Sequence, residues 1–210
     1  MITDPKSRPG TAGYAEAADL LAAQYESVSF DEVHREVLHL LPRRPGAVLD
    51  IGAGSGRDAA ALAALGHRTV AVEPTAELRS LGQRIHAGRA IEWVDDALPE
   101  LGVLRGRRER FDVVLLTAVW MHLDDRERGQ AMRSVAELSA PDGQLFLTLR
   151  HGPVPAGRRM FDVSPDDTVR LARRHGLTPV HLGEREDLHG RSGVRWSHLV
   201  LRKDADSTSL

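Results

Sequence analysis

Hydrophobic positions change their period several times along the chain. Short apolar runs alternate with longer stretches in which apolar residues recur every three or four positions. The first pattern is typical of buried strands and the second of amphipathic helices. Strands are expected at 47–51, 69–72, 91–94, 111–116, 144–149, 178–182 and 194–201. Helices are expected at 14–25, 30–41, 57–65, 76–86, 125–139 and 165–175.

This alternation predicts an α/β fold, a Rossmann-like three-layer sandwich with a mostly parallel sheet. No helix separates the last two strands, so they are expected to form an antiparallel pair at one edge of the sheet. Pro141-Asp142-Gly143 is expected to end the helix at 125–139. Ligands of such sheets bind beyond the carboxyl ends of the strands, beside the first strand.

The chain of 210 residues has the length and the hydrophobic content, 41%, of a single folded domain. We assign residues 45–203 to this domain, 1–44 to a tail and two preceding helices, and 204–210 to a disordered tail. No apolar run approaches the roughly 20 residues of a membrane span, and the first residues lack a signal-peptide core. The expected location is the cytoplasm, without a membrane partner.

Composition also excludes several kinds of chemistry. The absence of cysteine removes disulfides, thiolate metal sites and a cysteine nucleophile. A net charge of −2 provides no global attraction to nucleic acid, and the basic run at 105–110 is expected to be a solvated loop. Asp124 and Asp125 follow the fourth strand, but no matching acid–amide pair follows the fifth, so no metal site is expected.

A glycine turn follows the first strand. Gly52, Gly54 and Gly56 are spaced G-x-G-x-G, and Asp50 precedes them by two residues. The fingerprint of dinucleotide-binding proteins would place its third glycine one position later. Such a turn lets a ligand approach the backbone and the amino end of the next helix, although glycines that serve packing alone are the alternative.

Acidic residues follow the second and third strands. Glu73 ends the second strand 21 residues after Gly52, where a carboxylate can accept hydrogen bonds from both hydroxyls of a ribose. Asp95 and Asp96 follow the third strand, and Asp96 is preferred as acceptor for an adenine amino group. Either aspartate could instead cap the next helix.

These features, in this order, resemble the class I S-adenosylmethionine-dependent methyltransferases, in particular small bacterial methyltransferase-domain proteins, over about residues 47–149. The resemblance implies a seven-stranded sheet with an antiparallel C-terminal strand, and a helical lid at 11–41. It implies S-adenosylmethionine as cofactor and S-adenosylhomocysteine as product. The implied cofactor-binding residues are Asp50, Gly52, Ala53, Gly54, Gly56, Arg57, Glu73, Pro74, Asp95, Asp96, Ala97, Thr117 and Ala118. Asp142 departs from the family, which usually has glycine there.

Candidates for the acceptor side lie after the fourth and fifth strands and in the expected lid. His122 and His151 are candidate bases, although His122 could instead orient its loop. The substrate-binding candidates are Tyr14, Tyr25, Trp120, Arg150 and Arg159. Tyr25 and Trp120 could equally belong to the core.

The expected function is methyl transfer from S-adenosylmethionine to an oxygen or nitrogen of a small molecule, by a monomer or homodimer that binds no nucleic acid. One alternative is methylation of protein or RNA, which would need the arginines of 105–110 and 158–159 along one groove. Another is a protein that binds S-adenosylmethionine and catalyses a reaction other than methylation.

Overall fold

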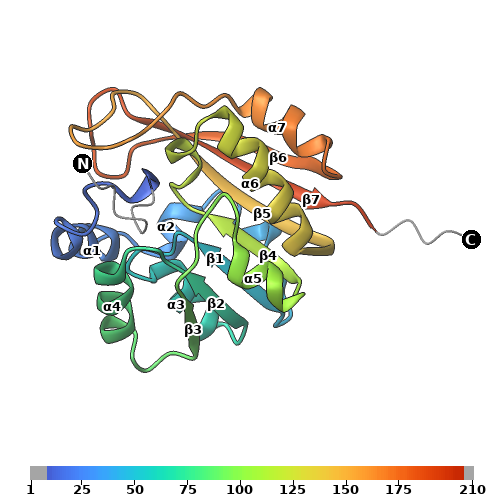
Figure 1. Ribbon diagram of the computed structural model, residues 1–210, viewed down its shortest axis with the longest axis horizontal. Helices are drawn as coiled ribbons and strands as arrows, with labels where there is room; N and C mark the ends of the chain where they lie inside the picture. Colours follow the sequence, from blue (N-terminus) through green and yellow to red (C-terminus); the bar gives the residue numbers. More distant parts are fainter. Residues whose placement is uncertain (1–8, 206–210) are drawn as a thin grey trace, which may run out of the picture.

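A seven-stranded sheet forms the centre of the computed structural model, which describes residues 9–205 (Figure 1). Its order is β3-β2-β1-β4-β5-β7-β6. The strands are β1 (Ala47–Ile51), β2 (Arg68–Val72), β3 (Ile91–Val94), β4 (Phe111–Leu116), β5 (Ser139–His151), β6 (Leu177–Glu186) and β7 (Arg195–Lys203). Only β7 runs antiparallel to its neighbours. The predicted fold class is confirmed, and β7 inserts between β5 and β6.

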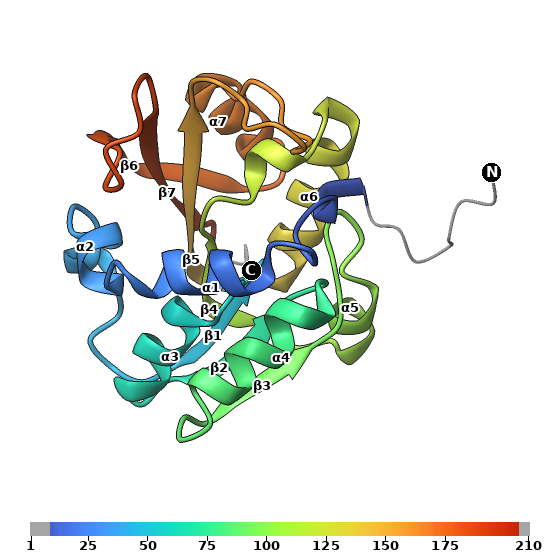
Figure 2. The same cartoon turned by 90° about the vertical axis from the view of Figure 1, so that its left-hand side faces the viewer.

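Helices cover both faces of the sheet, as Figure 2 shows. The helices are α1 (Ala18–Glu26), α2 (Phe30–His34), α3 (Arg57–Ala64), α4 (Ala76–Ile85), α5 (Gly102–Arg107), α6 (Asp125–Leu138) and α7 (Pro165–Arg173). The larger core lies under α5, α6 and α7, and the smaller one under α2 and α3. Helix α1 packs on α4 through Ala18, Ala22 and Leu78. None of the helices in residues 9–205 is long and apolar enough to cross a membrane.

The prediction of a solvated loop at 105–110 was wrong, because part of this basic run belongs to helix α5. Leu101 and Leu104 are fully buried and anchor the helix in the larger core. Arg105 and Arg107 form ion pairs with Glu137 and Glu92. A six-residue helix is too short to give a helical period in the sequence.

The two N-terminal helices are shorter than predicted. Helix α1 begins at Ala18, after turns in which Gly13 has a φ of +74°. Helix α2 begins as expected after Ser29, whose hydroxyl accepts from the backbone of Glu32 in a capping box. It ends at His34, and a 3-10 turn at Leu38–Leu40 follows. Of the two expected tails, residues 1–8 and 206–210 lie outside the described residues, and Pro9–Thr11 form a short 3-10 helix.

Pro141-Asp142-Gly143 does not end a helix, because α6 already ends at Leu138 and β5 begins at Ser139. Asp142 has a φ of +61°, and the pairing of β4 with β5 shifts its register here. The three residues therefore lie within an irregular start of β5, which is longer than predicted at both ends.

Candidate active site

A cavity of about 520 Å³ lies at the carboxyl ends of β1, β2, β4 and β5. Helix α1 and the segments 155–160 and 185–191 complete its wall. Fifteen of the predicted site residues line it. They are Tyr14, Tyr25, Asp50, Gly52, Ala53, Gly54, Arg57, Glu73, Pro74, Ala97, Thr117, Ala118, His122, Arg150 and Arg159. The other predicted site residues, Gly56, Asp95, Asp96, Trp120 and His151, lie elsewhere.

The glycine turn needs its glycines. Gly52, Gly54 and Gly56 have φ values of +72°, +58° and +88°. A Cβ on Gly52 would lie 2.5 Å from the Val119 side chain, and one on Gly54 would lie 3.1 Å from the Tyr25 ring. Gly56 instead packs beneath Trp93. Larger residues would therefore strain the backbone and fill the floor of the cavity.

Asp50 supplies a buried carboxylate with an unused oxygen. Its side chain is 1% exposed, and Oδ2 accepts no hydrogen bond from any described residue. Burial, with Asp58 nearby, raises the pKa of Asp50 well above its usual range. A buried carboxylate is stabilised by a cationic partner. The amine of S-adenosylmethionine is such a cation, so this residue fits the implied cofactor.

Glu73 joins the second strand to the glycine turn. Its Oε2 accepts from the Gly54 amide at 2.8 Å and its Oε1 accepts from the Thr75 amide at 2.7 Å. Burial raises the pKa of Glu73, although these two hydrogen bonds oppose the change. Each carboxylate oxygen can accept more than one hydrogen bond, so the ribose hydroxyls of a nucleoside also fit here.

Asp96 caps helix α5 and does not line the cavity. Its Oδ1 accepts from the Ala97 amide at 2.9 Å, and its Oδ2 accepts from the Leu104 amide at 3.0 Å. Asp95 is exposed and forms an ion pair with Arg79. The bond to Leu104, in the first turn of α5, supports the capping alternative for Asp96, and its adenine role stays a prediction. The apolar side chains of Leu98 and Pro99 line this part of the cavity instead.

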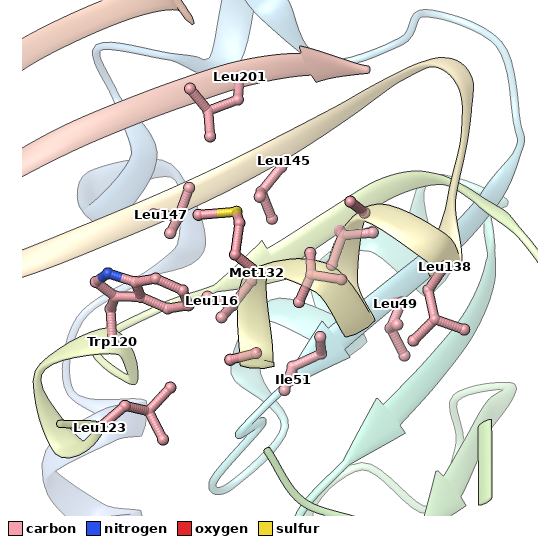
Figure 3. Close-up of a cluster of buried hydrophobic side chains, with 14 of the residues drawn as sticks. Leu49, Ile51, Leu116, Trp120, Leu123, Met132, Leu138, Leu145, Leu147 and Leu201 are labelled. Carbon is pink, nitrogen blue, oxygen red and sulfur yellow. The ribbon is translucent and has the colours of Figure 1, made fainter. Parts of the chain in front are cut away.

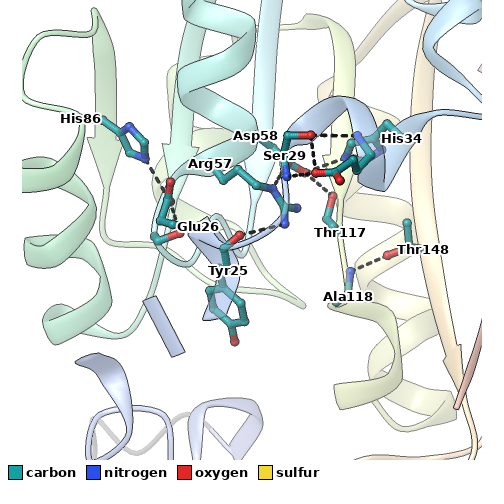
Figure 4. A network of polar contacts seen from close by, with 12 residues as sticks. Tyr25, Glu26, Ser29, His34, Arg57, Asp58, His86, Thr117, Ala118 and Thr148 are labelled. Atoms are coloured by element: carbon teal, nitrogen blue, oxygen red, sulfur yellow. Dashed lines mark hydrogen bonds and ion pairs between the residues drawn. The ribbon is translucent and has the colours of Figure 1, made fainter. Parts of the chain in front are cut away.

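Asp58, which sequence analysis missed, holds several parts of the site together (Figure 4). It accepts hydrogen bonds from Arg57 at 2.7 Å, His34 at 2.8 Å and Thr117 at 2.7 Å. Although burial opposes ionisation, Arg57 and His34 keep the pKa of Asp58 well below its usual range. Arg57 also donates to the carbonyl of Tyr25, so it fastens α1 to α3. The sequence signal that could have identified Asp58 is its position in the first turn of an alanine-rich helix, next to residues that are buried.

A second contact fastens α1 over the glycine turn. The Ser55 hydroxyl donates to Glu26 Oε1 at 2.6 Å, and the His86 ring lies 3.2 Å from the same oxygen. Together with the packing of α1 on α4, this contact holds α1 against the end of the cavity that contains the glycine turn, Asp50 and Glu73, which we call the donor end.

His122 and Tyr14 meet in the wall of the cavity. The Tyr14 hydroxyl lies 2.9 Å from His122 Nε2, and His122 Nδ1 lies 2.8 Å from the carbonyl of Arg159. A carbonyl can only accept, so Nδ1 carries the proton and Nε2 accepts from Tyr14. Burial lowers the pKa of His122 and favours the neutral ring.

His151 and Trp120 lie away from the cavity. Neighbouring residues of a strand point to opposite faces, so Arg150 faces the cavity and His151 bonds Ser197 Oγ at 2.7 Å. The expected strand ended before both residues, which hid this alternation. Trp120 is 1% exposed and belongs to the core with Met132 and Leu147 (Figure 3). Neither residue lines the cavity, so the geometry supports the core alternative for Trp120 and gives no support to a base role for His151.

Arg150 and Arg159 both line the cavity but differ in their partners. Arg159 donates to Glu127 at 2.8 Å and to Asp124 at 3.2 Å, which fastens its loop to α6. Arg150 has no carboxylate partner among residues 9–205. No group of three or more potential metal ligands occurs in this part of the chain.

Comparison with known proteins identifies the family. A model described as a methyltransferase domain matches residues 22–182. The uncharacterized methyltransferase OB1106 of Oceanobacillus iheyensis is 25% identical over 166 residues, which cover 74% of this chain and 67% of that protein.

Solved structures of methyltransferases share the fold. The 1,6-didemethyltoxoflavin-N1-methyltransferase of Burkholderia thailandensis superposes with a TM-score of 0.60 at 23% identity, over 97% of this chain and 93% of that chain. The magnesium protoporphyrin IX methyltransferase of Synechocystis PCC 6803 superposes with a TM-score of 0.66 at 16% identity, over 95% and 88% of the two chains. The chain therefore belongs to the methyltransferase-domain family and has the fold of the class I S-adenosylmethionine-dependent methyltransferases.

Proposed function

We propose that this enzyme transfers the methyl group of S-adenosylmethionine to an oxygen or nitrogen atom of a small molecule. The observation that carries the proposal is a contact between two distant segments in the wall of the cavity. Tyr14 from the N-terminal segment and Arg158 from the loop after β5 lie 4.0 Å apart, ring centre to guanidinium carbon, and both line the cavity. A cavity of about 520 Å³ has the size of a small-molecule site.

The donor end fits S-adenosylmethionine, which supplies an electrophilic methyl group when bound. Asp50 would hold the amine, and Glu73 would hold the ribose hydroxyls. The carbonyls of Thr117 and Ala118, which follow β4, would accept hydrogen bonds from the same amine as Asp50. Ala118 has a φ of +59°, and its amide donates to Thr148 at 2.7 Å, so this segment is held in an unusual conformation.

Tyr14 and His122 would position the acceptor and take its proton. The neutral His122 ring accepts from Tyr14, and an acceptor hydroxyl or ammonium in the cavity could donate to this pair. The main contribution of the enzyme would be alignment, because methyl transfer is an in-line displacement.

A protein or RNA acceptor receives less support. On α5, Arg105 and Arg107 form ion pairs with Glu137 of α6 and Glu92 of β3. Arg158 and Arg159 instead donate to the backbone carbonyls of Ala12 and His122. Arg158 and Arg159 line the cavity, and Arg105 and Arg107 do not. The Burkholderia structure, which contains 1,6-didemethyltoxoflavin, provides a small-molecule precedent within the fold.

The proposal can be tested by fractionating a bacterial extract. The purified enzyme and S-adenosylmethionine are incubated with the dialysable fraction or with the retained macromolecules, and S-adenosylhomocysteine release is measured. Release that depends on the dialysable fraction is expected. The proposal would be contradicted if S-adenosylhomocysteine were released only with the retained fraction and the methyl group were found in protein or RNA.

A further inference from the structure

Five arginines line the cavity on its acceptor side and in the covering loops, but they differ in how their charge is balanced. Arg159 is paired with Asp124 and Glu127, and Arg191 is paired with Asp187. Arg185 donates to His198 and lies over the Trp196 ring. Arg150 and Arg158 form no ion pair with any carboxylate in residues 9–205.

Of these two arginines, Arg150 has the greater need of a counter-charge, because only 8% of its surface is exposed. Its Nε is buried without a partner, and its best contact is a long hydrogen bond of 3.4 Å from NH1 to the carbonyl of Gly152. A buried cation is costly unless a counter-charge is close. Asp187 is near enough to favour the charge of Arg150, but its carboxylate is already bonded by Arg191, so a bound anion would add the direct partner that Arg150 lacks.

Arg158 is a second cation that lines the same cavity. Its NH1 donates to the carbonyl of Ala12 at 3.2 Å, and its guanidinium stacks on Tyr14. No acid that lines the cavity forms an ion pair with either of these two arginines in residues 9–205. Asp187 and Glu127 are already paired with arginines, and Asp50, Asp58 and Glu73 belong to the donor end.

We propose that the acceptor is an organic oxyanion, whose carboxylate or phosphate ester is bound by Arg150 with support from Arg158. This inference rests on the proposed function and adds the chemical class of the acceptor. A guanidinium offers two parallel donors to such a group. Met160 and Trp196, which line the same cavity, provide apolar contacts for the rest of the molecule.

The test uses benzoate, phenyl phosphate and the uncharged benzamide as probes. Each is titrated by calorimetry into the full-length protein, with and without saturating S-adenosylhomocysteine, at fixed ionic strength. At least one anion is expected to bind about 10-fold more tightly than benzamide. The tighter of the two anions identifies the oxyanion. If neither anion binds more tightly than benzamide, the proposal is overturned.

Variants assign the preference to its residues. Arg150→Gln is expected to remove the anion preference while S-adenosylhomocysteine affinity stays within about 2-fold, since Arg150 is assigned to the acceptor. Arg170→Gln, which removes an exposed cation of α7, is the matched control and should behave as the wild type. Retained preference in Arg150→Gln, or a loss confined to S-adenosylhomocysteine affinity, would overturn the assignment.

Two further readouts keep the test decisive. If Arg150→Gln does not fold, Arg158→Gln, on a loop, must weaken the anion preference for the proposal to stand. A wild-type protein that does not bind S-adenosylhomocysteine would contradict the proposed function. The anion preference is measured separately in the ligand-free protein, so the two failures are distinguishable.

Discussion

The Tyr14 hydroxyl donates a hydrogen bond of 2.9 Å to Nε2 of His122, across 108 residues of sequence. The His122 ring is fixed from its other side by the Arg159 carbonyl, and Arg158 stacks on the Tyr14 ring. Three segments, the residues before α1, the turn after β4 and the loop after β5, therefore meet at this pair.

Loss of His122 should slow methyl transfer if this pair takes a proton from the acceptor. We expect His122→Ala to lower kcat by about 10²-fold. Tyr14→Phe should lower kcat less, because the ring and its packing remain. Steady-state kinetics of S-adenosylhomocysteine formation measures both, with exposed His39→Ala as control. Near-normal turnover in His122→Ala would leave His122 only an orienting role.

Glu73 should govern cofactor affinity. We expect Glu73→Ala to weaken S-adenosylhomocysteine binding by about 10-fold or more, because a buried carboxylate that bonds the glycine turn and could accept from the ribose is removed. Calorimetry measures the affinity. Glu77→Ala, an exposed acid on α4, is the control. Equal affinity in Glu73→Ala and the wild type would exclude the ribose assignment.

Asp58 should matter for stability more than any surface ion pair. Its removal leaves Arg57 and His34 without their shared acceptor, so Asp58→Ala is expected to lose about 3 kcal/mol or more of unfolding free energy. Urea denaturation gives the value. Asp167→Ala, which breaks an exposed pair with Arg170, should change it by less than about 1 kcal/mol. Similar losses in the two variants would contradict the role of Asp58.

His198 should make the fold sensitive to acid. Burial, with Arg185, His34 and His181 nearby, lowers the pKa of His198 to about 3. The unfolded chain takes up this proton near pH 6.5 and the folded protein does not. The contribution to stability is therefore complete above pH 6.5 and is lost as pH falls towards 3, at about 1.4 kcal/mol per pH unit.

His198→Gln should reduce this slope by that amount, since glutamine keeps an acceptor for Arg185 but does not titrate. Unfolding free energies between pH 4 and 6.5 measure it, and exposed His39→Gln should keep the wild-type slope. An unchanged slope in His198→Gln would show that its protonation is not linked to unfolding.

Sequence alone was sufficient to predict the strands, the mostly parallel sheet and the residues after the first two strands that line the cavity. The parallel strands appear as apolar runs, and the glycine turn, Asp50 and Glu73 follow them at fixed distances, so local spacing already carried their positions. These features are local because each residue directly follows the strand that places it.

Tertiary structure decided the rest. Asp96 capping α5, Asp58 joining three segments, and Arg150 rather than His151 facing the cavity all depend on contacts between distant segments or on where a strand ends. The pairing of Tyr14 with His122, and the unpaired charge of Arg150, exist only once the chain has folded. Spacing along a chain places a residue at an edge of the sheet, but burial and partners determine what its side chain can do.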